Sequence, residues 1–332
     1  MVFKRILAII LAVLCVVFAF GCGKDNEGDD KLVVTIVVAG GLGDRSFYDS
    51  ANAGLQRLIE EYGVDGRVIE CKEDASMYQI QLVNAAEESD FVVAVGWQFW
   101  DALSELAPQM PDVKFIYVDE AVEGVDNIFN IKYAQNEGSF LVGYAAAKMS
   151  KTGKVGAVGG MDGDTINDFI VGYKQGAEYA NPDIEVMWNY AGTYEDPAKG
   201  KECALALYDS GCDIVFAIAG KTGDGVFNAA AETNNYAIGV DSDQKYINPD
   251  VIICSMIKQV GNSIFKTIED FIEEGKWEGG TIWTANLSTG LVGIGYGEET
   301  APQQISDEIK AEIKAIIGKI VAGEIIVETT RK

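Results

Sequence analysis

The chain has 332 residues, 48% of them hydrophobic, and carries a formal net charge of −25 with no histidine. A chain of this length can bury one large core or two medium ones. The acidic surface argues against binding to nucleic acid or to a bare anionic membrane. The missing histidine removes His-dependent triads, His-ligated zinc and the usual general base near neutral pH, so a binding function is favoured over catalysis.

The first 22 residues have the pattern of an export signal. MVFKR is positively charged, and the next 15 residues, ILAIILAVLCVVFAF, are apolar. This run is short for a membrane-spanning helix and typical of a signal peptide, although an uncleaved N-terminal anchor is the alternative. The run ends in Ala19-Phe20-Gly21-Cys22, which resembles a bacterial lipobox. We therefore predict a lipoprotein signal peptide over 1–22, a lipid on Cys22, a flexible tether over 23–31 and a folded part outside the cytoplasmic membrane.

From residue 32 onward the pattern alternates between strands and helices. Strands are predicted at 32–39, 67–71, 91–96 and 113–119, with helices at 47–62, at 77–88 and after Trp97. A second series follows a helix at 136–149, with strands at 154–160, 184–190, 213–220 and 236–241 and helices at 166–180, 198–209 and 223–232. Continuous apolar strands of this kind are typical of a parallel sheet covered by helices on both faces.

The two series resemble each other at their starts. VVAGGLGDRSF and GAVGGMDGDTINDF each read as strand, Gly-Gly, Asp and a helix that bears a Phe. The chain then continues through segments at 251–259, 281–287 and 291–297 to a helix at 304–321 with an apolar isoleucine stripe. We predict an α/β fold of two doubly wound parallel-sheet lobes joined by a multi-crossover hinge. Lobe one takes 32–133 and about 257–282, and lobe two takes 134–256 and about 283–332.

Four cysteines remain after the signal, namely Cys71, Cys203, Cys212 and Cys254. They show no CxxC and no metal-ligand spacing, so no metal site is predicted. Disulfides outside the cell are one possibility. Because each cysteine lies in an apolar strand or helix pattern, buried free thiols are the favoured interpretation.

A ligand site in such a fold lies in the cleft at the carboxyl ends of the strands. The loops there are aromatic and acidic and lack the basic cluster of a phosphate or nucleic-acid site. Asp119 and Asp241 each follow an apolar strand, where a carboxylate accepts hydrogen bonds from a ligand or caps the next helix. Phe47 and Phe216, one in each series, are candidates to stack a flat ligand, with core packing as the alternative. The remaining candidates in or near these loops are Asp44, Ser46, Trp97, Gly220 and Lys258. For Lys258, a structural ion pair is the alternative to a ligand contact.

Seven segments in order are similar to the basic membrane protein (BMP) family, which comprises the substrate-binding lipoproteins of ABC transporters for purine nucleosides. They are GGLGDRSFYDSANAGL, VGWQFWDAL, PDVKFIYVDE, EGSFLVGYAAAKMSKTGKVGAVGG, DIVFAIAGKTGDGVFNAA, YAIGVDSDQ and SMIKQVGNSI. The resemblance implies a type I periplasmic-binding-protein fold, a membrane permease as partner and no cofactor. It also implies that Phe47 and Phe216 stack the purine and that Asp119 reads the base. Asp241 and Lys258 would then take the sugar hydroxyls.

One position departs from this family pattern. Val38 stands where many members carry an Asp that holds the ribose. Losing a charged acceptor there costs on the order of 2–3 kcal/mol or more. The sequence therefore leaves a deoxynucleoside, a free base, riboflavin or another flat ligand as alternatives to a ribonucleoside.

The sequence is compatible with three functions. The leading one is a lipid-anchored solute-binding protein on the extracytoplasmic face of a bacterial membrane that delivers its ligand to a permease. A sensor that signals through the same lobe closure is the second. The third is a carboxylate-based nucleoside hydrolase that uses Asp119 or Asp241, and the absence of histidine and of a metal cluster argues against an enzyme.

Overall fold

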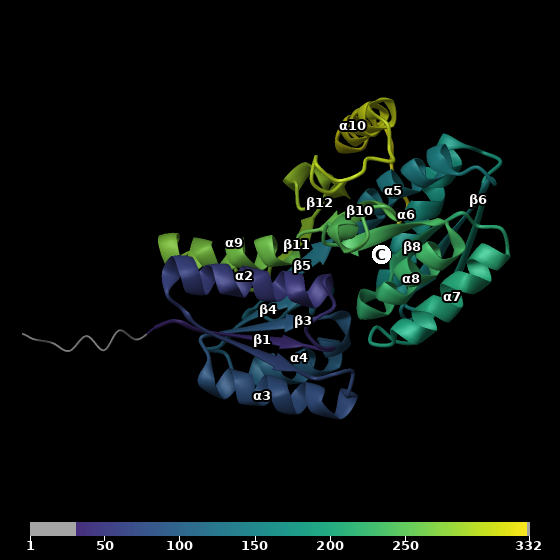
Figure 1. The fold of residues 1–332 in the computed structure, drawn as a ribbon. Coiled ribbons are helices and arrows are strands. Elements are labelled where there is room, and N and C mark those ends of the chain that lie inside the picture. The colour runs from purple at the N-terminus through teal and green to yellow at the C-terminus, as the bar shows by residue number, and fades with distance from the viewer. Residues whose placement is uncertain (1–30, 331–332) are drawn as a thin grey trace, which may run out of the picture. The chain divides into compact units, whose positions relative to one another are not determined.

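The computed structural model describes residues 31–330. The predicted signal peptide with Cys22, and all of the predicted tether except Lys31, lie outside the described residues. Residues 32–330 build two six-stranded sheets, each flanked by helices (Figure 1). The predicted α/β fold with two lobes is confirmed. We call the first sheet with its helices lobe one and the second sheet with its helices lobe two.

Lobe one is built on a wholly parallel sheet. Its order is β11-β5-β4-β3-β1-β2. The strands are β1 (Val33–Val38), β2 (Asp65–Glu70), β3 (Phe91–Val95), β4 (Lys114–Val118), β5 (Ile128–Tyr133) and β11 (Ile282–Ala285). Helices α2 (Phe47–Tyr62) and α9 (Val260–Glu274) lie side by side on one face, and α3 (Tyr78–Glu88) and α4 (Trp100–Leu106) cover the other (Figure 1). The central β3 is buried at all five positions, as expected for a strand covered on both faces.

Lobe two repeats this plan with one difference. Its order is β12-β10-β9-β8-β6-β7, and β12 pairs antiparallel to β10. The strands are β6 (Lys154–Gly159), β7 (Glu185–Tyr190), β8 (Ile214–Ile218), β9 (Tyr236–Asp241), β10 (Ile252–Lys258) and β12 (Val292–Gly295). The helices are α5 (Gln135–Met149), α6 (Asp164–Ala180), α7 (Pro197–Asp209), α8 (Gly223–Thr233) and α10 (Asp307–Val321). The sheet is therefore parallel except at one edge.

Short 3₁₀ turns complete the described elements. They lie at Ala75–Met77, Trp97–Phe99, Ala107–Gln109, Gly220–Thr222, Gln244–Ile247 and Leu287–Thr289. Two of them directly follow β3 and β8, at the carboxyl ends where a ligand site is expected.

The chain passes between the sheets three times. It leaves the first sheet after β5, returns after β10 to place α9 beside α2, and leaves again after β11 to add β12 to the second sheet. Three crossings form the multi-crossover hinge that the sequence predicts. The proposed lobe boundaries, at about 133, 257 and 283, stay a prediction.

Helices α5 and α6 pack with their backbones in direct contact. A Cβ atom placed at Gly172 would lie 2.1 Å from the carbonyl oxygen of Asn136, and one at Gly176 would lie 2.0 Å from that of Phe140. From the other side, a Cβ at Gly143 would lie 2.0 Å from the carbonyl oxygen of Tyr173. Glycine at these positions therefore permits a separation that any larger residue would prevent. This packing fixes α6, which carries Phe169 toward the cleft.

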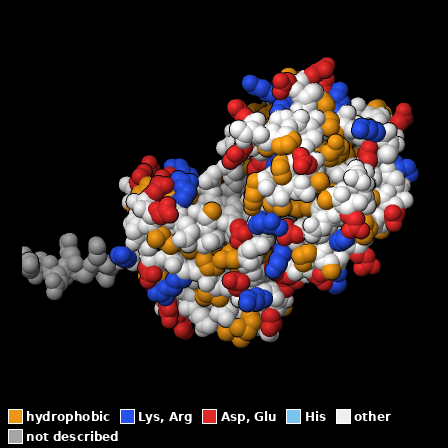
Figure 2. All heavy atoms as spheres, viewed as in Figure 1, with side chains coloured by type: hydrophobic (Ala, Val, Ile, Leu, Met, Phe, Trp, Pro, Cys, Tyr) orange, Lys and Arg blue, Asp and Glu red, His pale blue; other side chains and the backbone are white. Residues whose placement is uncertain are grey.

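The C-terminal helix α10 lies on lobe two. Ile313, Ile316 and Ile320 of its predicted stripe are buried. Among residues 31–330, no helix has the length and apolar character needed to cross a membrane. On the face shown in Figure 2, acidic and basic side chains are interspersed over the surfaces of both lobes.

All four cysteines that follow the signal are free in the structure. Cys71, Cys212 and Cys254 are buried, and Cys203 is half-buried. Burial raises the pKa of the Cys71 and Cys212 thiols to about 11. The prediction of free thiols is confirmed for all four cysteines, and the prediction of burial is confirmed for all of them except Cys203.

Candidate functional site

A cavity lies between the two sheets at the carboxyl ends of their strands. Residues from both lobes line it, including the ends of β9 and β10 and the loops after β1, β3, β4, β7 and β8. Seven of the residues predicted from the sequence line this cavity. They are Asp44, Phe47, Trp97, Asp119, Gly220, Asp241 and Lys258.

A buried ion pair occupies the wall of the cavity. The ammonium group of Lys258, at the end of β10, pairs with the carboxylate of Asp119, which follows β4. The Lys258 side chain is only 1% exposed. Its nitrogen lies 4.9, 4.8 and 5.3 Å from the ring centres of Phe47, Tyr133 and Phe169, respectively. Three aromatic faces and one carboxylate thus stabilise the cation in a site with little water.

The two strand-end aspartates share an unusual backbone. Asp119 has a φ of 86° and Asp241 a φ of 63°, in the left-handed region that few residues other than glycine enter. Aspartate tolerates this region better than most residues do. Such backbone conformations cost free energy and concentrate at functional sites. At both strand ends the chain turns in this way and places a carboxylate at the cavity.

Asp241 also bonds across the cleft. The hydroxyl of Ser46 donates to its carboxylate at 2.6 Å and lies 3.0 Å from the carbonyl oxygen of Val240. Ser46 is fully buried and does not line the cavity itself. Burial raises the pKa of Asp241 to about 6, while the charge of Lys258 and the bond from Ser46 act in the opposite direction. Ser46 therefore holds an acceptor that faces the cavity.

Asp44 fixes the start of α2. Its carboxylate accepts hydrogen bonds from the backbone N–H groups of Ser46, Tyr48 and Asp49 at 3.0, 2.9 and 3.0 Å. Ser46, at the N-cap position, makes no capping bond with its own side chain. The Asp44 side chain thus satisfies the free N–H groups of this helix end. Its burial raises its pKa to about 7. This helix start aims Phe47 at the cavity.

The prediction that Phe216 lines the cleft is wrong in position. Phe216 lies within β8, is fully buried and packs against Phe169 and Tyr173, with ring centres 6.4 and 5.4 Å apart. Because β8 continues to Ile218, which does line the cavity, Phe216 lies one pleat back in the core.

Lobe two supplies two other rings to the cavity wall, Phe169 of α6 and Tyr194 of the loop between β7 and α7. The sequence contains a signal for Phe169, since the two similar segments pair Phe47 with it.

Gln98 is a cavity residue that the sequence analysis did not single out. Its side-chain oxygen is buried and finds no hydrogen-bond partner among the residues described here. Gly96 has a φ of 124°, and a Cβ there would lie 2.5 Å from this oxygen. An unpaired buried acceptor is costly, so a ligand donor at this position is stabilising. No group of three or more potential metal ligands occurs within residues 31–330.

Comparison with known proteins identifies the family. Residues 31–331 match the model of the Bmp family, described as ABC transporter substrate-binding protein PnrA-like. The chain belongs to this family. BMP-family membership implies a small-molecule ligand, a transporter permease as partner and an extracytoplasmic, membrane-associated location. The protein is a substrate-binding protein of an ABC transporter, and its fold is the type I periplasmic-binding-protein architecture.

Individual relatives of this BMP-family protein support the same assignment to the family. The chain is 36% identical to the "ABC transporter nucleoside-binding protein BmpA" of Lactococcus lactis, over 96% of this chain and 98% of the relative. It is 33% identical to "Basic membrane protein A" of Borreliella burgdorferi, over 99% and 97%. Among solved structures, an ABC transporter solute-binding protein from Aeropyrum pernix superposes with a TM-score of 0.82 at 29% identity, covering 91% of this chain and 94% of that one.

Proposed function

We propose that this substrate-binding protein captures a purine nucleoside, with Phe47 from lobe one and an aromatic ring from lobe two on either side of the base. The carrying observation is the composition of the cavity, where aromatic rings surround the Lys258–Asp119 pair and the carboxylate of Asp241. Flat bases stack on such rings, and carboxylates accept hydrogen bonds from amino groups and sugar hydroxyls. The name of the Lactococcus relative supports the same ligand class.

We assign the polar side chains of the cavity to different parts of the ligand. Asp119 takes hydrogen-bond donors of the base, while Asp241 and Lys258 take the sugar hydroxyls. Val38 is fully buried at the end of β1 and is not among the cavity residues, so it offers the ligand no acceptor. The carboxylate that the same loop contributes is that of Asp44. On this basis a ligand that lacks one sugar hydroxyl loses less affinity than it would in a site with an additional Asp.

We further propose that the protein binds without transforming its ligand and is anchored by a lipid on Cys22 at the outer face of the cell membrane. The lipobox-like pattern supports the anchor. The carboxylates that line the cavity are those of Asp44, Asp119 and Asp241. Backbone N–H groups already bond to the first, and Lys258 pairs with the second.

Isothermal calorimetry on residues 23–332 tests the ligand. The protein is unfolded and refolded to remove carried ligand, then titrated with adenosine, guanosine, inosine, a deoxynucleoside and riboflavin. We expect 1:1 binding of a purine nucleoside, with the deoxynucleoside weaker only by the one hydroxyl contact it loses, because Val38 supplies no further acceptor. Binding of riboflavin alone, or of nothing in the panel, would contradict the nucleoside proposal while leaving the family intact.

Two phenylalanine substitutions separate the site from the core. Phe47→Ala is expected to weaken ligand binding by about 1–3 kcal/mol with little change in stability, because stacking acts locally. Phe216→Ala is expected to lower the free energy of unfolding by about 3–5 kcal/mol, because it empties a packed interior position. Calorimetric titration and urea denaturation of both variants make the comparison. If Phe216→Ala proves as stable as the parent but binds poorly, our placement of this ring in the core is wrong.

A further inference from the structure

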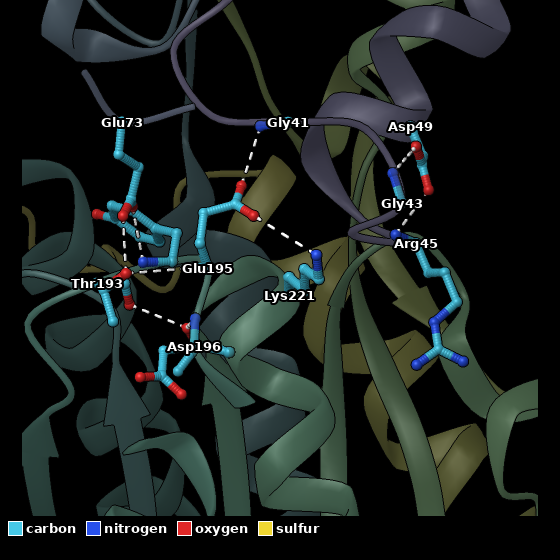
Figure 3. Close-up of polar contacts among 11 residues, drawn as sticks. Gly41, Gly43, Arg45, Asp49, Glu73, Thr193, Glu195, Asp196 and Lys221 are labelled. Carbon is cyan, nitrogen blue, oxygen red and sulfur yellow. Dashed lines mark hydrogen bonds and ion pairs between the residues drawn. The ribbon is translucent and has the colours of Figure 1, made fainter. Parts of the chain in front are cut away.

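Two glutamates bond across the cleft in opposite directions. Glu73 follows β2 in lobe one, and its two carboxylate oxygens accept from the backbone N–H of Tyr194 at 2.8 Å and from the hydroxyl of Thr193 at 2.7 Å. Glu195 belongs to lobe two, and its carboxylate accepts from the backbone N–H of Gly41 at 2.9 Å. Figure 3 shows the two side chains reaching past each other toward the opposite loop. We call this pair of contacts the glutamate clasp.

The loop that carries Glu73 is held in place by hydrogen bonds within lobe one. Lys72 and Glu73 have φ angles of 52° and 60°, and their N–H groups donate to the carbonyl oxygens of Gly40 and Ala39 at 2.9 and 2.8 Å. Glu73 is thus bonded to the glycine loop that follows β1. The N–H of Gly41 in this same loop donates to Glu195. The donor and the acceptor that lobe one offers to the clasp therefore move as one unit.

The partner loop in lobe two is ordered in the same way. Thr193 accepts from the backbone N–H of Glu195 at 3.1 Å while it donates to Glu73. The ammonium nitrogen of Lys221 lies 3.8 Å from the Glu195 carboxylate (Figure 3). Glu73 and Glu195 are both half-buried, so water and salt screen their contacts less than those of a surface pair. A Cβ at Gly40 would lie 2.7 Å from the Glu195 carboxylate, so the loop leaves room for it.

The clasp acts on the wall of the ligand cavity. Tyr194 lies between Thr193 and Glu195 in the chain, lines the cavity, and is bonded to lobe one through its own N–H. When the lobes separate, the contacts of Glu73 and Glu195 break together and this wall moves away from the ligand.

We propose that Glu73 and Glu195 are positioning residues that hold the closed form and set the rate of ligand release. Association begins in the open form, before these bonds exist, so the clasp leaves the association rate unchanged. Dissociation requires the bonds to break, so the clasp slows it. The proposal rests on the proposed function only in needing a ligand that is enclosed by this cavity, and it does not depend on which ligand that is.

The test compares Glu73→Ala and Glu195→Ala with Glu87→Ala on α3 and Glu202→Ala on α7, two exposed glutamates that remove the same charge from each lobe. Stopped-flow measurements with adenosine are expected to show dissociation about 10-fold faster in the clasp variants, with association within about 2-fold of the parent. Equal rates in clasp and control variants would overturn the proposal.

Amide hydrogen exchange on the protein as purified, before any carried ligand is removed by refolding, gives a second readout in the closed form that does not need adenosine to bind. Glu73 does not contact the N–H of Gly41, yet Glu73→Ala is expected to speed exchange at Gly41 because the clasp opens as a unit. Unchanged protection at Gly41 in Glu73→Ala would overturn the clasp. If adenosine fails to bind but Gly41 loses protection, the nucleoside proposal falls and the clasp stands.

Discussion

Lys258→Met is expected to lower the free energy of unfolding by about 3–5 kcal/mol, the cost of breaking a buried ion pair from one side. Lys258 is 1% exposed and its partner Asp119 is 7% exposed, so both charges have little contact with water. The substitution leaves the Asp119 carboxylate without its ion-pair partner and removes the cation that lowers the pKa of Asp241. Urea denaturation at pH 7.5 measures the loss.

Lys266→Met is the matched control. Lys266 lies on α9, is 60% exposed, and pairs with Glu269 and Asp270 at 3.1 and 2.8 Å. Because these pairs are in water, removing them is expected to cost far less stability than Lys258→Met does.

A double variant checks the cause of the loss at Lys258. Asp119→Asn combined with Lys258→Met is expected to recover a large part of the stability, since it removes the buried charge as well as its partner. If Lys258→Met is as stable as Lys266→Met, or the double variant is no more stable than the single one, the pair is not what stabilises this cleft.

The fold could be predicted from the sequence because its signals are local. Buried parallel strands such as β3 are continuous apolar runs, and helices such as α2 have a periodic apolar face. The strand-end rule then placed Phe47, Asp119 and Asp241 correctly at one cavity. The antiparallel pairing of β12 was not predicted. The direction of this strand depends on the path of the chain through the hinge and not on the amino-acid sequence of the strand itself.

The parts that escaped prediction depend on exact length or on contacts far apart in the chain. Phe216 was predicted at the cleft because the apolar run does not show where β8 ends. The strand continues for two residues beyond Phe216, and this places the ring in the core instead of at the cavity. Glu73 and Tyr194 are 121 positions apart, and Gly41 and Glu195 are 154 apart. No periodicity encodes such pairs, since they arise only from the way the two sheets face each other.

Stability and ligand affinity are expected to change in opposite directions as the pH falls from 7.5 to 5.5. Burial raises the pKa of Asp44 to about 7 and that of Asp241 to about 6, from 3.8 for both. The folded protein therefore binds these protons more tightly than the unfolded chain does. The fold is penalised where both carboxyls are ionised, and it gains stability as the pH falls through 7 and 6 toward the unfolded pKa.

The gain in the free energy of unfolding over this range is about 2–3 kcal/mol, most of it from Asp44. Urea midpoints at pH 7.5, 6.5 and 5.5 measure it. Asp44→Asn is expected to flatten most of the pH dependence, and Asp241→Asn a smaller part. A stability that instead falls steadily from pH 7.5 to 5.5 in the parent would show that these two carboxyls do not hold their protons in the fold.

Affinity follows Asp241 rather than Asp44. Asp44 is occupied by three backbone N–H groups, whereas the carboxylate of Asp241 faces the cavity and accepts from the ligand when ionised. A protonated carboxyl loses its charge and one acceptor site, and charged hydrogen bonds are worth about 1.5–3 kcal/mol against 0.5–1.5 for neutral ones. We expect the dissociation constant of the ligand to rise as the pH passes below 6 in the parent and to stay level in Asp241→Asn. Calorimetric titrations at the same three pH values decide it, and a parallel rise in both proteins would assign the effect to another group.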